Sequence, residues 1–322
     1  MSESVVILSG ARTAIGSFDG SLRGIAPVEL GAEVAKAAIA RSGLEAEAVD
    51  QAVFGNIIHT EPRDMYLARA ASIAAGVKLD TPALTLNRLC GSGLQAVVSG
   101  AQAIMLGDAG TVLVGGAENM SRSPHATQSI RSGQKMGDLR FTDMLIGALS
   151  DPFGTGHMGV TAENIAADEG ITRETQDAIA LESHRRAIQA IDAGYFKDQI
   201  IPVEVKSRRE TRIFDTDEHA RRDVTAEGLA GLRPVFQKDG TVTAGNASGI
   251  NDGAAALILM SETLAGKQGR TPVAKILGYA HAGVDPTRMG IGPVPAVTKL
   301  LARTGLSVED FDVIESNEAF AA

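Results

Sequence analysis

Over the first 115 residues, short apolar runs alternate with longer segments in which apolar residues recur every three or four positions. Short runs are typical of strands, and the longer spacing is typical of helices packed on one face. The pattern predicts strands at residues 5–8, 51–58, 83–86 and 111–114, and helices at 27–42, 65–75 and 92–106. Strands separated by helices of this length indicate parallel pairing within a layered α/β fold.

The beginning of the chain recurs near its end. The sequence Ala-Arg-Ser-Gly-Leu at residues 40–44 is answered by Ala-Arg-Thr-Gly-Leu at 302–306, an offset of 262, and Asp50 is answered by Asp312 at the same offset. This spacing predicts a duplicated α/β unit, with an unfinished second copy whose strand follows Asp312. A chance similarity between alanine- and glycine-rich helix ends is the alternative.

The middle of the chain has a different character from both ends. It holds a polar loop at 129–139, a helix-like segment at 176–193 and a charged stretch at 206–212. We therefore predict three parts: an N-terminal half formed by residues 1–120 and 241–268, an inserted loop domain at 121–240, and the start of a C-terminal half at 269–322.

Composition limits the classes of function. The net charge of −9 argues against a nucleic-acid partner, and a single cysteine excludes an internal disulfide framework. The histidines and the cysteine show no metal-ligand spacing, so no metal is expected. No basic segment with a long apolar stretch precedes the first strand, and no run was found that reaches membrane-spanning length. We therefore expect a cytoplasmic protein without a membrane partner.

Cys90 lies where a strand-like run gives way to a helix-like segment. Unpaired backbone N–H groups at a helix start favour the thiolate, which is the nucleophilic form of cysteine. Gly91 and Gly93 leave room for a carbonyl group and let backbone amides face its oxygen. A buried structural thiol is the alternative, since it is the usual role of a lone cysteine. The neighbouring glycines favour a nucleophile.

Four motifs resemble those of the thiolase family, in the order and spacing of that family. They are Asn-Arg-Leu-Cys-Gly-Ser-Gly at 87–93, Gly-His-Met-Gly at 156–159, Thr-Ala-Gly-Asn-Ala-Ser-Gly-Ile-Asn-Asp-Gly at 243–253, and Asn-Glu-Ala-Phe at 317–320. The opening Arg-Thr-Ala-Ile-Gly at 12–16 also fits. Residues 60–66 and 281–286 resemble the bacterial β-ketothiolases that feed polyhydroxyalkanoate synthesis.

The resemblance implies a layered αβαβα fold of two duplicated halves and a reversible acyl transfer between coenzyme A and a carbon acceptor. It makes Cys90 the residue that carries the acyl group as a thioester, and Asn317 the residue that positions a water in the oxyanion pocket. Without the family, Asn317 would be interpreted as a turn residue. The resemblance also implies a homotetramer, built as a dimer of dimers, with residues 121–139 contributing to assembly.

Coenzyme A and acyl-CoA enter as substrates, and no permanently bound cofactor is implied. Ser248 matches the serine that binds a pantetheine amide, with a turn hydroxyl as the alternative. Arg221 matches the arginine near the nucleotide; the charged stretch 206–212 is a weaker candidate that more often forms a solvated face. His157 by itself could serve as a base for Cys90, but the family places it in the pantetheine channel. The other positions matching that channel are Leu149, Met158, Phe236, Ala244, Gly249, Ala319 and Phe320.

Two further thiolase motifs, a Gly-His-Pro and a Cys-x-Gly-Gly-Gly, do not occur in the chain. The resemblance places both beyond residue 322 and implies that the C-terminal portion is missing. If no more residues exist, we expect very weak or absent turnover, because taking the α-proton needs a suitably placed base, and we expect the exposed edge of an incomplete sheet to invite aggregation. Two alternatives remain open: a ketoacyl-synthase-like condensing enzyme that uses carrier-protein substrates, and a non-catalytic acyl-CoA-binding fragment.

Overall fold

The computed structural model describes residues 3–206 and 210–322. The chain forms two compact units, each made of separate segments. Unit 1 comprises residues 1–145, 194–219 and 250–276, and unit 2 comprises residues 146–193, 220–249 and 277–322. The two thiolase halves and the inserted domain defined above follow different boundaries and stay a prediction.

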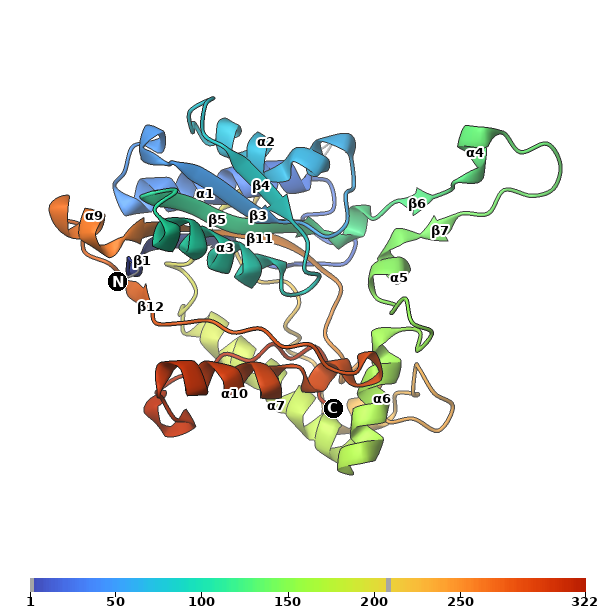
Figure 1. Ribbon diagram of the computed structural model, residues 1–322. Helices are drawn as coiled ribbons and strands as arrows, with labels where there is room; N and C mark the ends of the chain where they lie inside the picture. The colour runs from blue at the N-terminus through green and yellow to red at the C-terminus, as the bar shows by residue number, and fades with distance from the viewer. Residues whose placement is uncertain (1–2, 207–209) are drawn as a thin grey trace. The chain divides into compact units, whose positions relative to one another are not determined.

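One large mixed sheet forms the centre of unit 1 (Figure 1). Its main strands lie in the order β12-β1-β11-β5-β3-β4, and β2 and β8 pair at its margins. The strands are β1 (Val5–Thr13), β2 (Gly16–Ser17), β3 (Gln51–Gly55), β4 (Ala83–Leu86), β5 (Thr111–Asn119), β8 (Ile200–Ile201), β11 (Asn251–Ser261) and β12 (Ala274–Ile276).

The parallel pairing predicted for the strands of the first 115 residues is correct where those strands are neighbours, but the sheet as a whole is mixed. Strand β3 is parallel to β4 and β5, but β11 is antiparallel to both of its neighbours, β1 and β5. The physical reason is that β11 comes from a distant part of the chain and inserts between two strands of the first 120 residues. The rule for strand–helix–strand units covers consecutive elements and does not describe such an insertion.

Helices cover both faces of the sheet in unit 1 (Figure 1). Helices α1 (Pro27–Ser42) and α2 (Leu67–Ala74) pack over one apolar cluster that includes Phe54 and Leu113, and α3 (Ser92–Leu106) packs over a second cluster on the other face. A Cβ at Gly100 of α3 would lie 2.5 Å from Val114 Cγ1. Helix α3 therefore lies close against β5, which fixes the position of its N-terminal end.

The stretch Leu89–Leu106 has the length and mean hydropathy of a membrane-spanning helix. The expectation that no run reaches that length is therefore wrong by those two measures. The helix instead packs on the sheet through residues such as Ala96, Ala101 and Ile104. Core helices pass the same test of length and composition, so the test does not assign this helix to a membrane.

An arm extends from the sheet of unit 1 at residues 121–145 (Figure 1). It contains β6 (His125–Ala126), α4 (Ser129–Ser132) and β7 (Thr142–Asp143), with β6 and β7 paired in antiparallel register. Unit 1 also contains α9 (Glu262–Lys267) and the hairpin of β9 (Val203–Lys206) and β10 (Thr211–Phe214). Helix α5 (Met144–Ala148) lies at the boundary where unit 1 passes into unit 2.

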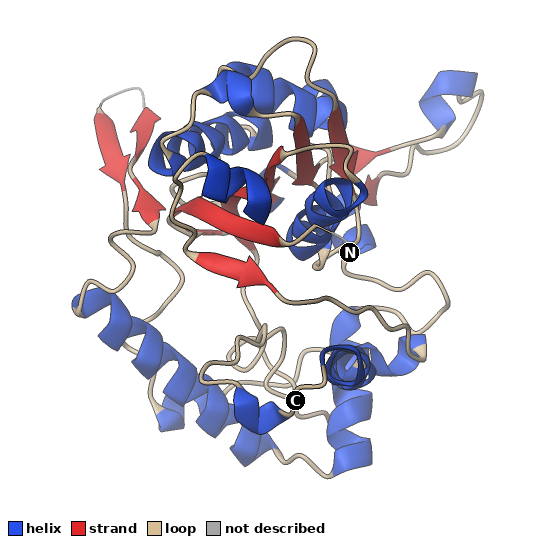
Figure 2. Ribbon diagram, turned by 60° about the vertical axis from the view of Figure 1, so that its left-hand side comes forward, coloured by secondary structure: helices blue, strands red, loops and turns tan. Residues whose placement is uncertain are grey.

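Unit 2 is mainly helical (Figure 2). Its helices are α6 (Met158–Glu169), α7 (Arg173–Asp192), α8 (Ala226–Ala230) and α10 (Pro293–Thr304). After α10, residues 308–310 form a short 3₁₀ turn, and residues 311–318 form no strand. The strand predicted after Asp312 is therefore wrong for this structure, because an extended segment needs a neighbouring strand to complete its hydrogen bonds.

The elements around the repeated sequence do correspond. Gly43 ends α1 with a φ of 68°, and Gly305 ends α10 with a φ of 73°. A left-handed residue at this position closes a helix, and glycine adopts it without strain. In both places a 3₁₀ turn follows, at residues 46–48 and 308–310, so the offset of 262 holds for local structure as well as for sequence.

Candidate functional site

Cys90 lies in a tight turn that joins β4 to α3 in unit 1, and it is exposed. This exposure contradicts the alternative of a buried structural thiol. Leu89 has a φ of 44°, a left-handed conformation that costs a residue with a branched side chain free energy. The turn stays in place because the Ser92 hydroxyl donates to Leu89 O at 2.6 Å and accepts from Arg88 N at 2.8 Å.

The sequence analysis did not identify Asn87 and Ser92 as residues that stabilise this turn by hydrogen bonds. Asn87 Oδ1 accepts from Leu89 N at 2.8 Å, and Ser92 is almost fully buried. An asparagine that accepts from the N–H two residues later is a known turn device and was available as a signal. The N–H groups of Gly91 and Ser92 donate to Arg88 O and Leu89 O, so these two amides are engaged within the turn.

An open cavity of about 510 Å³ lies beside Cys90 within unit 1. Its lining is mostly apolar and comes from α3, β5 and β11, with Leu94, Val97 and Leu257 among the residues. Gly93 lines it too, and a Cβ built at Gly93 would meet no heavy atom of the described residues within 4 Å. Packing therefore does not require glycine there, which leaves the space next to the sulfur free for a substrate.

Glu118 of β5 lines the same cavity and was not singled out from the sequence. The pKa of Glu118 is raised to about 7: burial is the largest cause and the nearby carboxylates of Asp64 and Asp252 add to it, against the opposing effect of hydrogen bonds from Ile57 N and Ile58 N. A carboxyl with this pKa exchanges its proton near neutral pH. Only the tertiary structure could reveal it, because burial causes the shift.

The other predicted site residues all belong to unit 2. His157 is the N-cap of α6: its Nδ1 accepts from Gly159 N at 3.0 Å. Its ring stacks on Phe236 with a centroid separation of 4.7 Å. Burial lowers the pKa of His157, and an Nδ1 that accepts a hydrogen bond carries no proton. The remaining ring nitrogen, Nε2, is then the donor, which suits contact with a ligand better than removal of a proton.

Several predicted channel residues meet in unit 2. The ring of Phe320 packs edge-on to Phe236 at 6.2 Å, and Ser248 N donates to Ala319 O at 2.9 Å. Met158 N donates to Leu149 O at 2.8 Å. The segments around residues 149, 157, 236, 248 and 320 are thus joined by stacking and backbone hydrogen bonds. Gly249 is half-buried in the same loop as Ser248, whereas Ala244, Ser248 and Asn317 are exposed.

Arg221 does not join this group through the contacts described. Its guanidinium pairs with Asp223 at 3.3 Å, with both side chains largely exposed, and its backbone N donates to His184 Nδ1. In the charged stretch 206–212, residues 207–209 lie outside the described residues, and Arg212 donates to Ser21 Oγ in unit 1. Within residues 3–206 and 210–322, no three His, Cys, Asp or Glu side chains are grouped to hold a metal ion.

Comparison with known proteins identifies the family. The model of the thiolase N-terminal domain matches residues 5–263, and the model of the thiolase C-terminal domain matches residues 270–322. The chain belongs to the thiolase family of acyltransferases. It is 58% identical to the β-ketothiolase BktB of Cupriavidus necator, over an alignment that covers all of this chain and 82% of that protein.

Solved thiolase structures share the fold of this family member. The acetyl-CoA acetyltransferase of Bacillus anthracis is 47% identical with a TM-score of 0.97, covering 99% of this chain and 81% of that chain. Human mitochondrial 3-ketoacyl-CoA thiolase in complex with CoA is 44% identical with a TM-score of 0.95, covering 99% of this chain and 80% of that chain. The α/β fold class and the family predicted from the motifs are confirmed.

Proposed function

We propose that this thiolase transfers acyl groups through a thioester on Cys90. The observation that carries the proposal is an exposed cysteine at the start of α3, beside an open apolar cavity, in a chain matched over its length by thiolase domains. The Cys90 thiolate attacks the carbonyl carbon of an acyl-CoA, a carbon–sulfur bond forms, and coenzyme A leaves as its thiolate and takes up a proton.

In the second half-reaction, a general base takes an α-proton from another acyl-CoA, and the resulting carbanion attacks the Cys90 thioester. A carbon–carbon bond forms, the bond to Cys90 Sγ breaks, and a 3-ketoacyl-CoA is released. Thiolysis is the reverse sequence. Relatives named acetyl-CoA acetyltransferase and β-ketothiolase support this reaction. From the resemblance of residues 60–66 and 281–286 to bacterial β-ketothiolases, we assign acetoacetyl-CoA and 3-ketovaleryl-CoA as products, and with them a supply of precursors for polyhydroxyalkanoate synthesis. The relatives favour this interpretation over a ketoacyl synthase or a non-catalytic binding fragment.

Coenzyme A is the substrate in this proposal and no cofactor is bound permanently. His157 Nε2–H and the exposed Ser248 hydroxyl contact the pantetheine arm, which runs past the rings of Phe236 and Phe320, and Arg221 serves the nucleotide end. The exposure of Ser248 and the half-buried aromatic pair support this assignment. Asn317 is assigned to the water in the oxyanion pocket. We also propose that the protein assembles as a homotetramer, as the resemblance to thiolases implies, and that it acts in the cytoplasm, with which a single free cysteine is compatible.

Acetylation of the whole chain by acetyl-CoA tests the proposal. Because Cys90 is the only cysteine, intact-mass measurement should show one acetyl group per chain, and peptide mapping should place it on Cys90. Cys90→Ser should abolish the labelling at neutral pH, since a serine hydroxyl is far less ionised than a thiol. Labelling that persists in this variant, or a wild-type chain that binds CoA without acetylation, would contradict the proposal.

A further inference from the structure

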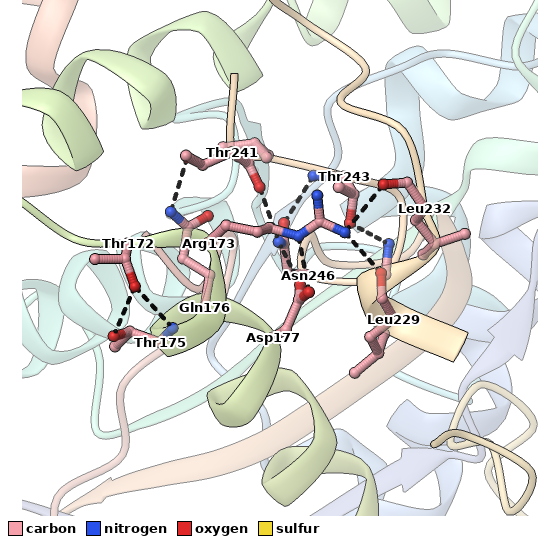
Figure 3. Close-up of polar contacts among 12 residues, drawn as sticks. Thr172, Arg173, Thr175, Gln176, Asp177, Leu229, Leu232, Thr241, Thr243 and Asn246 are labelled. Carbon is pink, nitrogen blue, oxygen red and sulfur yellow. Dashed lines mark hydrogen bonds and ion pairs between the residues drawn. The ribbon is translucent and has the colours of Figure 1, made fainter. Parts of the chain in front are cut away.

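The loop at residues 243–249 carries Ser248 and is attached to two helices of unit 2 by buried polar side chains. Figure 3 shows the contacts with α7. On one side, Glu163 of α6 accepts from the backbone N–H groups of Thr241 and Val242 at 2.8 and 2.9 Å. Glu163 is 5% exposed, so its carboxylate forms these hydrogen bonds in the protein interior. It fixes the point at which the loop begins.

On the other side, Asn246 is held by α7. Its Nδ2 donates to Asp177 Oδ1 at 2.9 Å and to Thr241 O at 3.1 Å, and its Oδ1 accepts from Thr243 N at 2.8 Å. Asn246 is 3% exposed and Asp177 is 8% exposed. An asparagine that satisfies all three of these bonds has a single orientation, because its amide nitrogen and oxygen cannot exchange places.

Arg173 completes the group, which we name the Asn246 cluster: Arg173, Asp177 and Asn246 (Figure 3). Arg173 Nε donates to Asp177 Oδ2 at 2.7 Å. The same guanidinium donates through Nη2 to Leu229 O and Leu232 O, at the end of α8. Each carboxylate oxygen of Asp177 therefore has its own donor, Arg173 on one and Asn246 on the other, and charge-assisted bonds of this kind are stronger than neutral ones.

The backbone around Asn246 also holds the segment that follows Asn317. Asn246 O accepts from Ala321 N at 2.9 Å, Ser248 N donates to Ala319 O, and Ala247 bridges to Phe320. The backbone that follows the buried Asn246 side chain thus joins two stretches that the proposed function assigns to substrate binding, residues 247–249 and 319–320. Ala244 and Ser248 of this loop are exposed, whereas Asn246 is buried.

We propose that Asn246 is a positioning residue that, through Asp177 and Arg173, sets the place of the Ser248 loop and of residues 319–321 for coenzyme A. This inference rests on the proposed function in assigning those stretches to the pantetheine arm. Asn246 itself touches no substrate in this proposal. Its effect is to keep the binding loop ordered before the ligand arrives, which improves affinity by lowering the cost of ordering on binding.

The first test is the substitution Asn246→Asp. It preserves shape and the acceptor for Thr243 N but places a carboxylate against Asp177. We expect the dissociation constant for CoA, measured by calorimetry, to rise about tenfold, as expected for loss of a charge-assisted hydrogen bond. The half-saturating acetyl-CoA concentration for Cys90 acetylation should rise equally, with the maximal acetylation rate changed less than threefold.

The matched control is Asn164→Asp on α6, whose Nδ2 donates to Thr287 O. It should leave both values unchanged.

The reciprocal double variant N246D/D177N is the sharper test. Its amide at position 177 would donate to the carboxylate at position 246 and accept from Arg173, so the cluster is rebuilt with its polarity reversed, apart from the bond to Thr241 O. Most of the affinity for CoA should return. Should Asn246→Asp fail to fold, Asp177→Asn alone carries the test. A rise of about tenfold is expected, because the amide nitrogen that replaces one carboxylate oxygen is a donor and faces either Arg173 or Asn246, which are donors too. An affinity equal to wild type in the single variants, or no recovery in the double variant, would overturn the proposal.

Hydrogen exchange distinguishes positioning from general destabilisation and does not depend on the proposed function. In Asn246→Asp, peptides covering residues 241–249 and 317–322 should exchange faster, while the β5 peptide at residues 111–119 keeps its protection. Faster exchange in all three would overturn the proposal. Failure of the proposed function would give a different result. A wild-type chain that binds CoA but is never acetylated contradicts the role of Cys90 and leaves the inference about Asn246 intact.

Discussion

At the scale of single residues, Glu118 couples the stability of unit 1 to pH. Its carboxylate accepts from Ile57 N at 2.8 Å and Ile58 N at 3.0 Å, but burial raises its pKa from 4.5 to about 7. The neutral form is therefore favoured in the folded state. The contribution of Glu118 to the free energy of unfolding is roughly 3 kcal/mol in total. It is fully present below pH 4.5 and is lost as the pH rises through about 7.

Glu118→Gln should flatten this dependence. The amide stays neutral and keeps one acceptor for the turn at residues 57–58, so the free energy of unfolding should change less between pH 4.5 and 7.5 than in wild type. Urea unfolding at several pH values measures it. Glu45→Gln at an exposed position is the control and should reproduce the wild-type curve. If the free energy of unfolding of Glu118→Gln varies with pH as steeply as that of the wild type, another group causes the pH dependence.

The roles of individual residues were predictable to different degrees. The position of Cys90 at a helix start followed from the change in pattern at residues 86–92. The cap formed by His157 did not, since a histidine accepting from the backbone N–H two residues later has no distinctive sequence signature. The shifted pKa of Glu118 was equally hidden, because it arises from burial and from carboxylates that are distant along the chain, Asp64 and Asp252.

At the scale of elements, Arg12 fastens the end of β1 to the loop after β10. Its guanidinium binds Asp217 through two parallel hydrogen bonds of 2.8 and 3.0 Å, and Asp217 Oδ1 also accepts from Ile15 N. The guanidinium lies 5.1 Å from the ring centroid of Phe196. The opening motif at residues 12–16 is thus explained by its contacts within unit 1.

Arg12→Lys should lower the free energy of unfolding by about 2 kcal/mol, since an ammonium cannot form the paired bonds or stack on Phe196. Arg12→Met should cost more, about 3 kcal/mol, because it leaves Asp217 half-buried without a counter-charge. Chemical denaturation measures both. The control Arg23→Lys alters an exposed pair with Asp19 and should cost less than about 0.5 kcal/mol. Equal losses at positions 12 and 23 would contradict this account.

At the scale of the whole molecule, the arm of unit 1 carries large apolar side chains that are open to solvent. Ile130, Met136 and Phe141 are 57%, 87% and 56% exposed. Exposed apolar groups gathered on one projecting segment are typical of association surfaces. They support the prediction that residues 121–139 contribute to assembly of a tetramer, and they extend it to Phe141.

Ile130→Glu combined with Met136→Glu should reduce the assembly to dimers, because burying two carboxylates at an interface is costly. Sedimentation velocity at several protein concentrations measures the mass. Leu79→Glu, an apolar-to-acidic change at a similarly exposed position outside the arm, is the control and should leave the mass of the assembly unchanged. A double variant that sediments like wild type would remove the arm from the interface.

The sequence by itself determined the main helices and strands, the repeat at an offset of 262, and the cysteine at the start of a helix. These features depend on neighbouring residues, whose periodicity and turn-forming side chains act locally. Only the tertiary structure decided that β11 runs antiparallel between β1 and β5, that no strand follows Asp312, and that Asn246 is held by Asp177. Each of these depends on a partner from a remote segment, and the hydrogen bonds or burial that such a partner supplies leave no local pattern in the chain.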